Sequence, residues 1–308
     1  MFENWNMKKV VLYIVATMFI SFGIGFGILA STSGGAVNLL NTAFSGGRFE
    51  VNQEKISQGN AITAINIEAS SADIIIIPED RSDVKAQLTG RVSSADIEPK
   101  LEMTLENDKL VISAKNKNVI VGINVSSNLQ LKVYVPKGYE HSIKASTASG
   151  DISIKDFKLK EFICNVASGD LTINNITSEN ISCTSASGSL EGDNIISKTT
   201  SFKIVSGHVK LQKFKGELKG TSTSGKINVS YTEFDNDINL SSTSGDVKIS
   251  LPKTSEFYLD ARTTSGHIRC DFPITISENK KNNVLCGTVK SGTNKINIHV
   301  TSGDINID

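Results

Sequence analysis

Apolar and polar residues alternate along most of this chain, and in its second half the alternation recurs around a Ser-Gly pair. The first copy runs from Thr147 to Ile154, and the glycine returns at 150, 169, 188, 207, 225, 245, 266 and 303. Counted from each glycine, mostly apolar residues stand two and four positions later, and five and seven positions earlier, with polar residues between them. This alternation is typical of half-buried strands.

Each repeat therefore predicts a strand, a sharp corner at Ser-Gly, a second strand and a variable loop that absorbs the unequal intervals. Glycine suits a corner that needs positive φ, and serine can bond nearby backbone groups there. The predicted corners are Ser149, Gly150, Ser168, Gly169, Ser187, Gly188, Ser206, Gly207, Ser224, Gly225, Ser244, Gly245, Ser265, Gly266, Ser302 and Gly303.

One such unit cannot bury its thin apolar face alone, whereas stacked units form a continuous core. We therefore predict an all-β, single-stranded β-solenoid with coils of about 19 residues. The alternative is an antiparallel sandwich. A sandwich would not need the same corner dipeptide at a fixed spacing, so the solenoid is favoured.

The region before the regular repeats alternates less evenly. Ala69–Pro78 resembles a degenerate copy of the repeat, with Ala72 in the place of the glycine. The stretch Leu101–Ala114 predicts a hairpin that turns at Glu106–Lys109. We expect one solenoid domain over residues 61–308, with irregular first layers over 61–140 and regular repeats over 141–308.

The N-terminus predicts a membrane anchor. Residues 1–9 end in Lys8 and Lys9, and residues 10–30 carry no charge. A run of about 20 apolar residues is long enough to span a bilayer as a helix. The preceding lysines predict a cytoplasmic N-terminus and an extracellular C-terminal domain at the cell membrane. A cleaved signal peptide is the alternative. Residues 31–60 are rich in Gly, Ser and Asn and predict a linker.

Composition narrows the classes of function. The chain has 32 basic and 32 acidic residues, and this balance argues against a nucleic-acid partner. We find no phosphate-binding loop, no nucleophile elbow and no Cys-x-x-Cys zinc motif. We therefore expect no cofactor, no metal and no catalytic residues.

The four cysteines are explained more simply by packing than by chemistry. Cys164 and Cys183 hold the same inward position in adjacent coils, so a disulfide is one interpretation. Small apolar core residues are the favoured one. Cys270 also occupies an inward position, and Cys286 falls in an irregular segment that the pattern does not place.

The position after the glycine varies most and is the candidate surface column. It carries Asp151, Asp170, Asp246 and Asp304, alongside serine, lysine and two histidines. Neighbouring carboxylates can hold a cation, but a solvated turn face is the favoured interpretation. His208 and His267 share the column three coils apart, roughly 14 Å at the strand spacing, which is too far to share a metal. Asp235 and Asp237 are expected to be solvated turn residues, and His141 and His299 have no evident partner.

These repeats resemble a bacterial family named putative adhesins, also called LiaG-like. The resemblance runs from about Gly46 to Asp308 and rests on Ser71–Ile74, the Val135-Pro136 strand end and the Ser-Gly-Asp-Ile repeats. It also rests on the close from Phe272 to Ile305, which predicts that the last repeat is a closing coil. The resemblance implies a β-solenoid in the bacterial cell envelope, with links to envelope-stress regulation in some members. It supplies no catalytic residues.

We therefore expect a non-catalytic protein that presents a binding or scaffold surface outside the membrane. Its partners would be the membrane itself and an envelope protein or a cell-wall polymer. An enzyme acting on cell-wall polysaccharide is the first alternative, and a purely structural spacer is the second.

Overall fold

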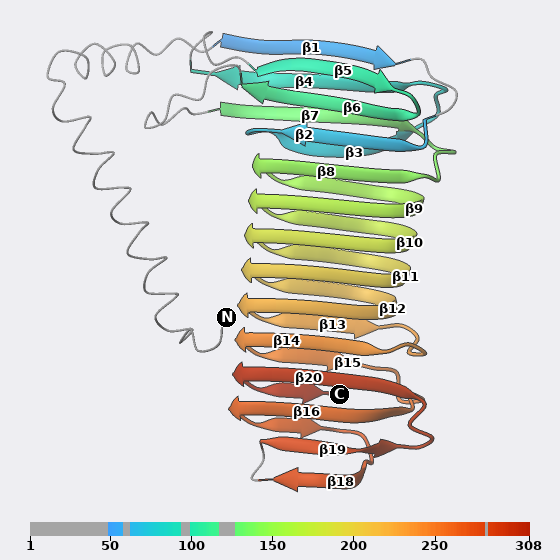
Figure 1. Cartoon of the computed structure of the whole chain (residues 1–308), viewed down its shortest axis with the longest axis vertical. Helices are drawn as coiled ribbons and strands as arrows, with labels where there is room; N and C mark the ends of the chain where they lie inside the picture. The colour runs from blue at the N-terminus through green and yellow to red at the C-terminus, as the bar shows by residue number, and fades with distance from the viewer. Residues whose placement is uncertain (1–48, 58–61, 94–98, 117–126, 281–282) are drawn as a thin grey trace, which may run out of the picture. The chain divides into compact units, whose positions relative to one another are not determined.

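The chain folds as an all-β protein, as predicted, in every part that the structure describes. A computed structural model describes residues 49–57, 62–93, 99–116, 127–280 and 283–308. Within these residues all regular elements are strands, and the 21 strands belong to one hydrogen-bonded network that stacks layer upon layer (Figure 1). The predicted anchor at 10–30 lies outside the described residues. None of the described residues forms a helix with the length and hydropathy needed to cross a membrane.

The regular coils lie in sequence order. They are built by β8 (Ser142–Ser149), β9 (Ile152–Ser168), β10 (Leu171–Ser187), β11 (Leu190–Ser206) and β12 (Val209–Ser224). Successive strands pair in parallel, so that Cys183 lies beside Cys164 and Leu171 beside Ile152. This register keeps each residue type in a column along the stack.

The predicted loop between coils is absent from the coils of β9 to β11. These strands each run for 17 residues and bend within the strand. The bend lies six residues after each corner glycine, where Asp156 has φ 61°, Asn175 φ 53° and Asn194 φ 55°. Aspartate and asparagine tolerate this left-handed conformation better than most residues, so the chain turns there without leaving the sheet.

The inward columns form the core. The column two residues after each glycine is buried to the same degree in the regular coils, and Ile152, Leu171 and Leu190 are each 1% exposed. Burying one such side chain contributes about 1.5–3 kcal/mol relative to leaving it in water. Farther along, the interior is filled by edge-to-face aromatic contacts that link Phe214, Tyr231, Phe234 and Phe257, with ring centroids 5.1–6.1 Å apart.

The N-terminal layers continue the stack both beside β8, which precedes a corner, and beside β9, which follows it. They comprise β1 (Phe49–Ser57), β2 (Ala64–Ala69), β3 (Asp73–Glu79), β4 (Val84–Val92), β5 (Pro99–Glu106), β6 (Lys109–Asn116) and β7 (Ser127–Pro136). Strand β2 pairs in parallel with β8 and β6, and β3 with β9 and β7. The predicted hairpin is confirmed, since β5 and β6 pair antiparallel with Glu106 opposite Lys109.

Part of the predicted linker is a strand. Residues 49–57, assigned to the linker at 31–60, form β1, which pairs antiparallel with β4 along its whole length. The amide of Gln53 then bridges to β5, accepting from the N–H of Leu101 at 2.8 Å and donating to the carbonyl of Pro99 at 2.9 Å. The polar composition misled the prediction because an edge strand faces solvent on most of its positions.

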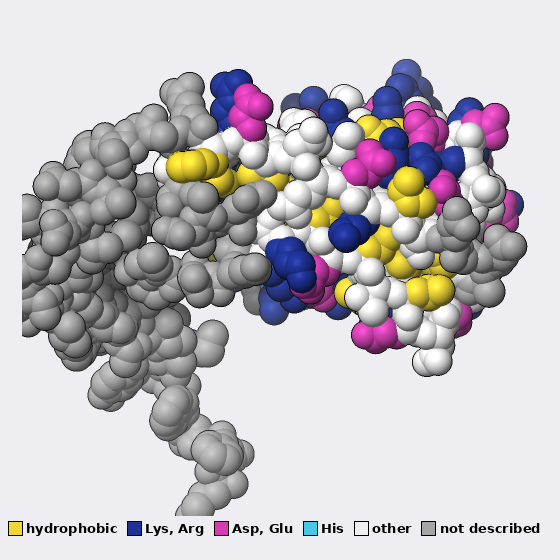
Figure 2. All heavy atoms as spheres, turned by 90° about the horizontal axis from the view of Figure 1, so that it is seen from above, with side chains coloured by type: hydrophobic (Ala, Val, Ile, Leu, Met, Phe, Trp, Pro, Cys, Tyr) yellow, Lys and Arg dark blue, Asp and Glu magenta, His cyan; other side chains and the backbone are white. Residues whose placement is uncertain are grey.

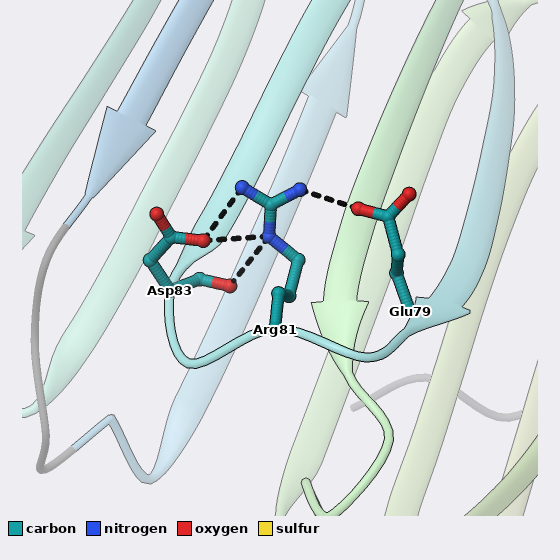
Figure 3. Close-up of polar contacts among 3 residues, drawn as sticks. All are labelled: Glu79, Arg81 and Asp83. Carbon is teal, nitrogen blue, oxygen red and sulfur yellow. Dashed lines mark hydrogen bonds and ion pairs between the residues drawn. The ribbon is translucent and has the colours of Figure 1, made fainter.

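An arginine clamps the crossover between β3 and β4, which lie on opposite sides of β7. Arg81 donates to the carboxylate of Asp83 at 2.6 Å and to that of Glu79, and it also donates to the backbone carbonyl of Asp83 (Figure 3). Partial burial acts to lower the pKa of Arg81, but the two carboxylates outweigh it and raise that pKa. The clamp fixes the path of the chain over the end of β7.

The C-terminal coils do not lie in sequence order. They comprise β13 (Ile227–Tyr231), β14 (Ile238–Ser244), β15 (Val247–Ser250), β16 (Phe257–Ser265), β17 (Ile268–Cys270), β18 (Thr275–Lys280), β19 (Val284–Val289), β20 (Asn294–Ser302) and β21 (Ile305–Ile307). Strand β20 lies between β14 and β16, and β21 lies between β15 and β17 (Figure 1).

The prediction that the last repeat closes the stack is therefore wrong. The closing layers are β19, which pairs antiparallel with β16, and β18, which pairs with β19. The outer edge of β16 is thus occupied, and the last repeat inserts on its inner edge. Asp237 helps to hold it there by accepting the backbone N–H of Lys295 at 2.8 Å, so this residue is more than a solvated turn residue.

Candidate binding face

The corner glycines stack directly on one another. In the eight Ser-Gly corners the glycine φ lies between 122° and 152°, a region that side chains rarely adopt. A Cβ on Gly188 would lie 1.9 Å from the carbonyl oxygen of Gly169. The corner serines are all exposed. The Ser-Gly pairs thus shape the coil, and their regularity needs no ligand to explain it.

The column after the corner is a ladder of side-chain caps. The N–H of Asp170 donates to the carboxylate of Asp151 at 2.8 Å, and that of Ser189 donates to Asp170 at 2.7 Å. Farther along, Asp304 donates to Asp246 at 3.2 Å, and His267 donates to Asp304 at 2.8 Å. Each carboxylate therefore satisfies a backbone donor of the next coil.

The predicted surface column is thus already engaged in holding coils together. The N–H of Asp304 has the largest effect on the Asp246 carboxyl and lowers its pKa. Burial opposes this to a smaller extent, and Lys226 lowers the pKa further. Among the described residues no group of three or more His, Cys, Asp or Glu side chains could hold a metal ion. A binding role for this column remains a prediction, and in the structure its carboxylates hold neighbouring coils together.

A second ladder lies at the bend within the strands. The amide of Asn175 donates to Asp156 at 2.8 Å, and that of Asn194 donates to Asn175 at 3.0 Å. The sequence holds the signal, since Asp or Asn recurs six residues after three successive corner glycines. The alternation of the strands does not reveal this signal, because these positions fall in the segment that is expected to be a variable loop.

The histidines are more widely separated than the sequence suggests. Because β20–β21 inserts into the stack, His208 and His267 lie four coils apart instead of three. The ring of His208 accepts the N–H of Lys226 at 3.0 Å. His299, for which the sequence offered no partner, lies on β20 between Ser241 and Arg262.

The cysteines behave as core residues more than as a chemical site. Cys164 and Cys183 are buried neighbours and are both free thiols. Burial raises the pKa of the Cys164 thiol well above its ordinary value, and the neighbouring Cys183 adds to the rise. Cys270 is only half-buried, which corrects its assignment to the core. Cys286 is buried at the far end and donates to Asp260 at 3.4 Å.

The strands that precede the corners expose a long regular face. We define the display face as the residues two, four and six positions before each corner glycine, all of which point outward. The column two before the glycine is exposed throughout and changes character midway. In stack order it reads Ala148, Ala167, Ala186, Val205, Thr223, Thr243, Thr301 and Thr264.

Two shallow grooves lie on this face. The first, of ≈ 480 Å³, crosses the alanine half and is bordered by Ser146, Asn165 and Thr184. The second, of ≈ 420 Å³, crosses the threonine half, and its polar lining is Lys219, Thr221, Asn239, Ser241, Asp260, Asn297 and His299. Both volumes lie within the usual range for small-molecule sites. The grooves are open, and an open groove suits an extended ligand better than a small ligand that needs an enclosed pocket.

One solved structure shares this fold, and two others show a weaker likeness. A putative adhesin from Bacteroides fragilis is 12% identical, with a TM-score of 0.50 over 84% of this chain and 97% of that one. A putative lipid-binding protein from Parabacteroides distasonis is 13% identical, with a TM-score of 0.39 over 83% and 96%. A putative cell adhesion protein from Clostridium sporogenes is 14% identical, with a TM-score of 0.30 over 83% and 99%.

The family is set by the sequence model that matches the chain. No curated protein matches the sequence. The model described as Toastrack DUF4097 matches residues 62–308, which cover every described strand after β1. The chain therefore belongs to the Toastrack DUF4097 family.

Proposed function

We propose that this chain is a non-catalytic envelope protein whose stacked coils present the display face to a component of the cell surface. The observation that carries the proposal is the register of that face. Its outward side chains repeat in columns over eight coils. Repeat folds commonly bind through such extended surfaces.

The setting is part of the same proposal. Residues 10–30 would hold the chain in the cell membrane with the N-terminus in the cytoplasm, and the strands would lie outside. The Bacteroides fragilis protein of similar fold is named a putative adhesin, and that name is consistent with a binding role. At this level of identity the likeness itself concerns the fold alone.

A retention experiment tests the binding role. The full-length protein, purified in a non-glycosidic detergent, is incubated separately with purified cell wall and with a membrane fraction from the host bacterium. We expect retention by one of them. Thr184→Arg with Thr221→Arg should abolish it, because both side chains lie at the centre of the display face.

The matched control carries the same charges on the strands that follow the corners, away from the display face. Thr172→Arg with Asn228→Arg changes outward positions three residues after the corner and should leave retention intact. If neither fraction retains the protein, the coils serve as a spacer and the proposal fails. Release of sugar fragments from the cell wall would instead favour an enzyme.

The topology is tested on intact cells. An externally added protease should degrade the domain of the anchored protein but leave a cytoplasmic marker intact. Protection of the domain would place it on the other side of the membrane and overturn the setting proposed here.

A further inference from the structure

The groove on the threonine half of the display face is assembled by the insertion of β20. On this side β14 pairs with β20 and not with β16, whose partners among the described strands are β19 and β20. With it, Asn239 lies beside Asn297 and Ser241 lies beside His299. The four neighbouring strands β12, β14, β20 and β16 then present one patch about 14 Å wide at the usual strand spacing.

The centre of this patch holds no Lys, Arg, Asp or Glu side chain, and an ion pair lies at each of its two edges. On the β12 side, Lys219 lies 2.8 Å from Glu217. On the β16 side, Arg262 lies 2.7 Å from Asp260. Each formal charge at the border thus has an opposite charge within its own strand. Between the borders lie amide, hydroxyl and imidazole groups, contributed by Asn239, Ser241, Asn297, His299 and the flanking threonines.

The central amides are oriented by each other. The side-chain N–H of Asn297 donates to the side-chain oxygen of Asn239 at 2.9 Å. Asn297 is exposed and Asn239 half-buried. A carboxamide has two donors and an oxygen with two lone pairs, so both residues keep hydrogen-bonding capacity beyond this one bond. Groups that are already oriented lose less conformational entropy when a ligand binds.

We infer that this groove binds a neutral glycan chain, laid across β12, β14, β20 and β16. The inference rests on the proposed function and names the ligand class for that face. A sugar hydroxyl both donates and accepts, as the amides and hydroxyls of the patch do. The central strip on β14 and β20 holds no Lys, Arg, Asp or Glu side chain, so an ionic polymer seated there would lose hydration without gaining a carboxylate, ammonium or guanidinium partner.

The test measures oligosaccharide binding to the full-length protein in a non-glycosidic detergent. The probes are hexamers of N-acetylglucosamine, of glucose and of galacturonate, titrated by calorimetry. We expect at least one neutral hexamer to bind and the anionic hexamer to bind at least about tenfold more weakly, which corresponds to about 1.4 kcal/mol. Asn239→Asp with Asn297→Asp should abolish neutral binding, since it removes donors and adds two charges.

The control makes the same change away from the display face. Asn228→Asp with Asn306→Asp alters outward positions three residues after the corner, on β13 and β21. It should leave the affinity for the neutral hexamer within about twofold, which corresponds to about 0.4 kcal/mol. Circular dichroism of both double variants shows whether the fold is kept.

Three results would overturn the inference: no binding of either neutral hexamer, preferential binding of galacturonate, or equal loss of binding in the two double variants. These results are separable from failure of the proposed function. If cell wall or membrane still retains the protein while the hexamers do not bind, the display role stands and only the glycan assignment is lost.

Discussion

The coils from Gly150 to Gly207 and those from Gly225 to Gly266 share the same corner but are built in different ways. The first group winds in sequence order, with strands of 16 or 17 residues that bend without a loop. The second group is broken by loops, packs aromatic rings, and admits β20–β21 from farther along the chain. The corner is therefore common to coils of both kinds, while the pairing of strand edges decides the order of the coils.

The largest expected effect concerns the corner, which both groups need. Gly188→Ala would place a Cβ 1.9 Å from a backbone oxygen at φ 134°. Because backbone must move and the new residue is strained, we expect a loss of about 3 kcal/mol or more, or failure to fold. Equilibrium urea unfolding of the purified protein measures it.

Gly138→Ala is the matched control. No atom lies within 4 Å of a Cβ there, so the expected change is within about 0.5 kcal/mol. If Gly188→Ala were equally mild, close stacking of the corners would not be what holds the coils at their spacing.

A smaller effect separates an inserted β20 from a closing one. Ile298 on β20 is 1% exposed. Ile298→Ala should cost about 2–4 kcal/mol, as an interior truncation does. Ile154→Ala in the regular coils should cost a similar amount, because that residue is equally buried.

Ile276 on β18 provides the contrast, since it is 52% exposed in the layer that closes the stack. Ile276→Ala should change stability by no more than about 0.5 kcal/mol. An Ile298→Ala effect as small as that of Ile276→Ala would contradict the inserted position of β20.

The smallest effect concerns the cap ladder. The folded pKa of Asp246 is lowered, chiefly by the N–H of Asp304. Its contribution to stability is therefore complete above the unfolded pKa of about 3.9 and is lost as the pH falls through the folded pKa. Asp246→Ala should cost about 1 kcal/mol at pH 7 and should reduce the loss of stability between pH 4 and pH 2, roughly the range below that unfolded pKa.

Asp246→Asn sharpens this result because the amide oxygen can still accept the N–H of Asp304. We expect a cost of about half that of Asp246→Ala at pH 7, with the same reduced acid dependence. Stability curves over pH for the three proteins decide it, and an unchanged acid slope in both variants would rule out a contribution from this carboxyl.

Much of the fold was readable because each coil repeats a local pattern. The alternation around Gly150 predicts strands and a corner, and the same residues are those that line the core. The order of the last coils was not readable, since Ile296, Ile298 and Val300 have the same alternation as any other repeat. Nothing in such a local pattern tells which strands will lie on either side of it, here β14 and β16.

The candidate groove was hidden for the same reason. Asn239 and Asn297 are 58 residues apart in sequence, and each alone is an ordinary outward position on a strand. Only the inserted strand brings them into one patch. Conversely, the aspartates after the corner stood out in the sequence, and the structure uses them to bind the backbone of neighbouring coils.

The inserted strand also determines how the chain must assemble. Each of β9 to β12 can dock on a strand that has already been synthesised, so the regular coils can form one by one from the N-terminal side. Among the described strands, β16 pairs with β19 and β20, and β17 pairs with β21, all of which lie later in the chain. The contacts that join these strands to the stack are therefore non-local, and such contacts slow folding. A chain interrupted before Asn294 would hold a column of coils that ends at β14, and a β16–β19 pair that lacks β20, the strand that joins it to that column.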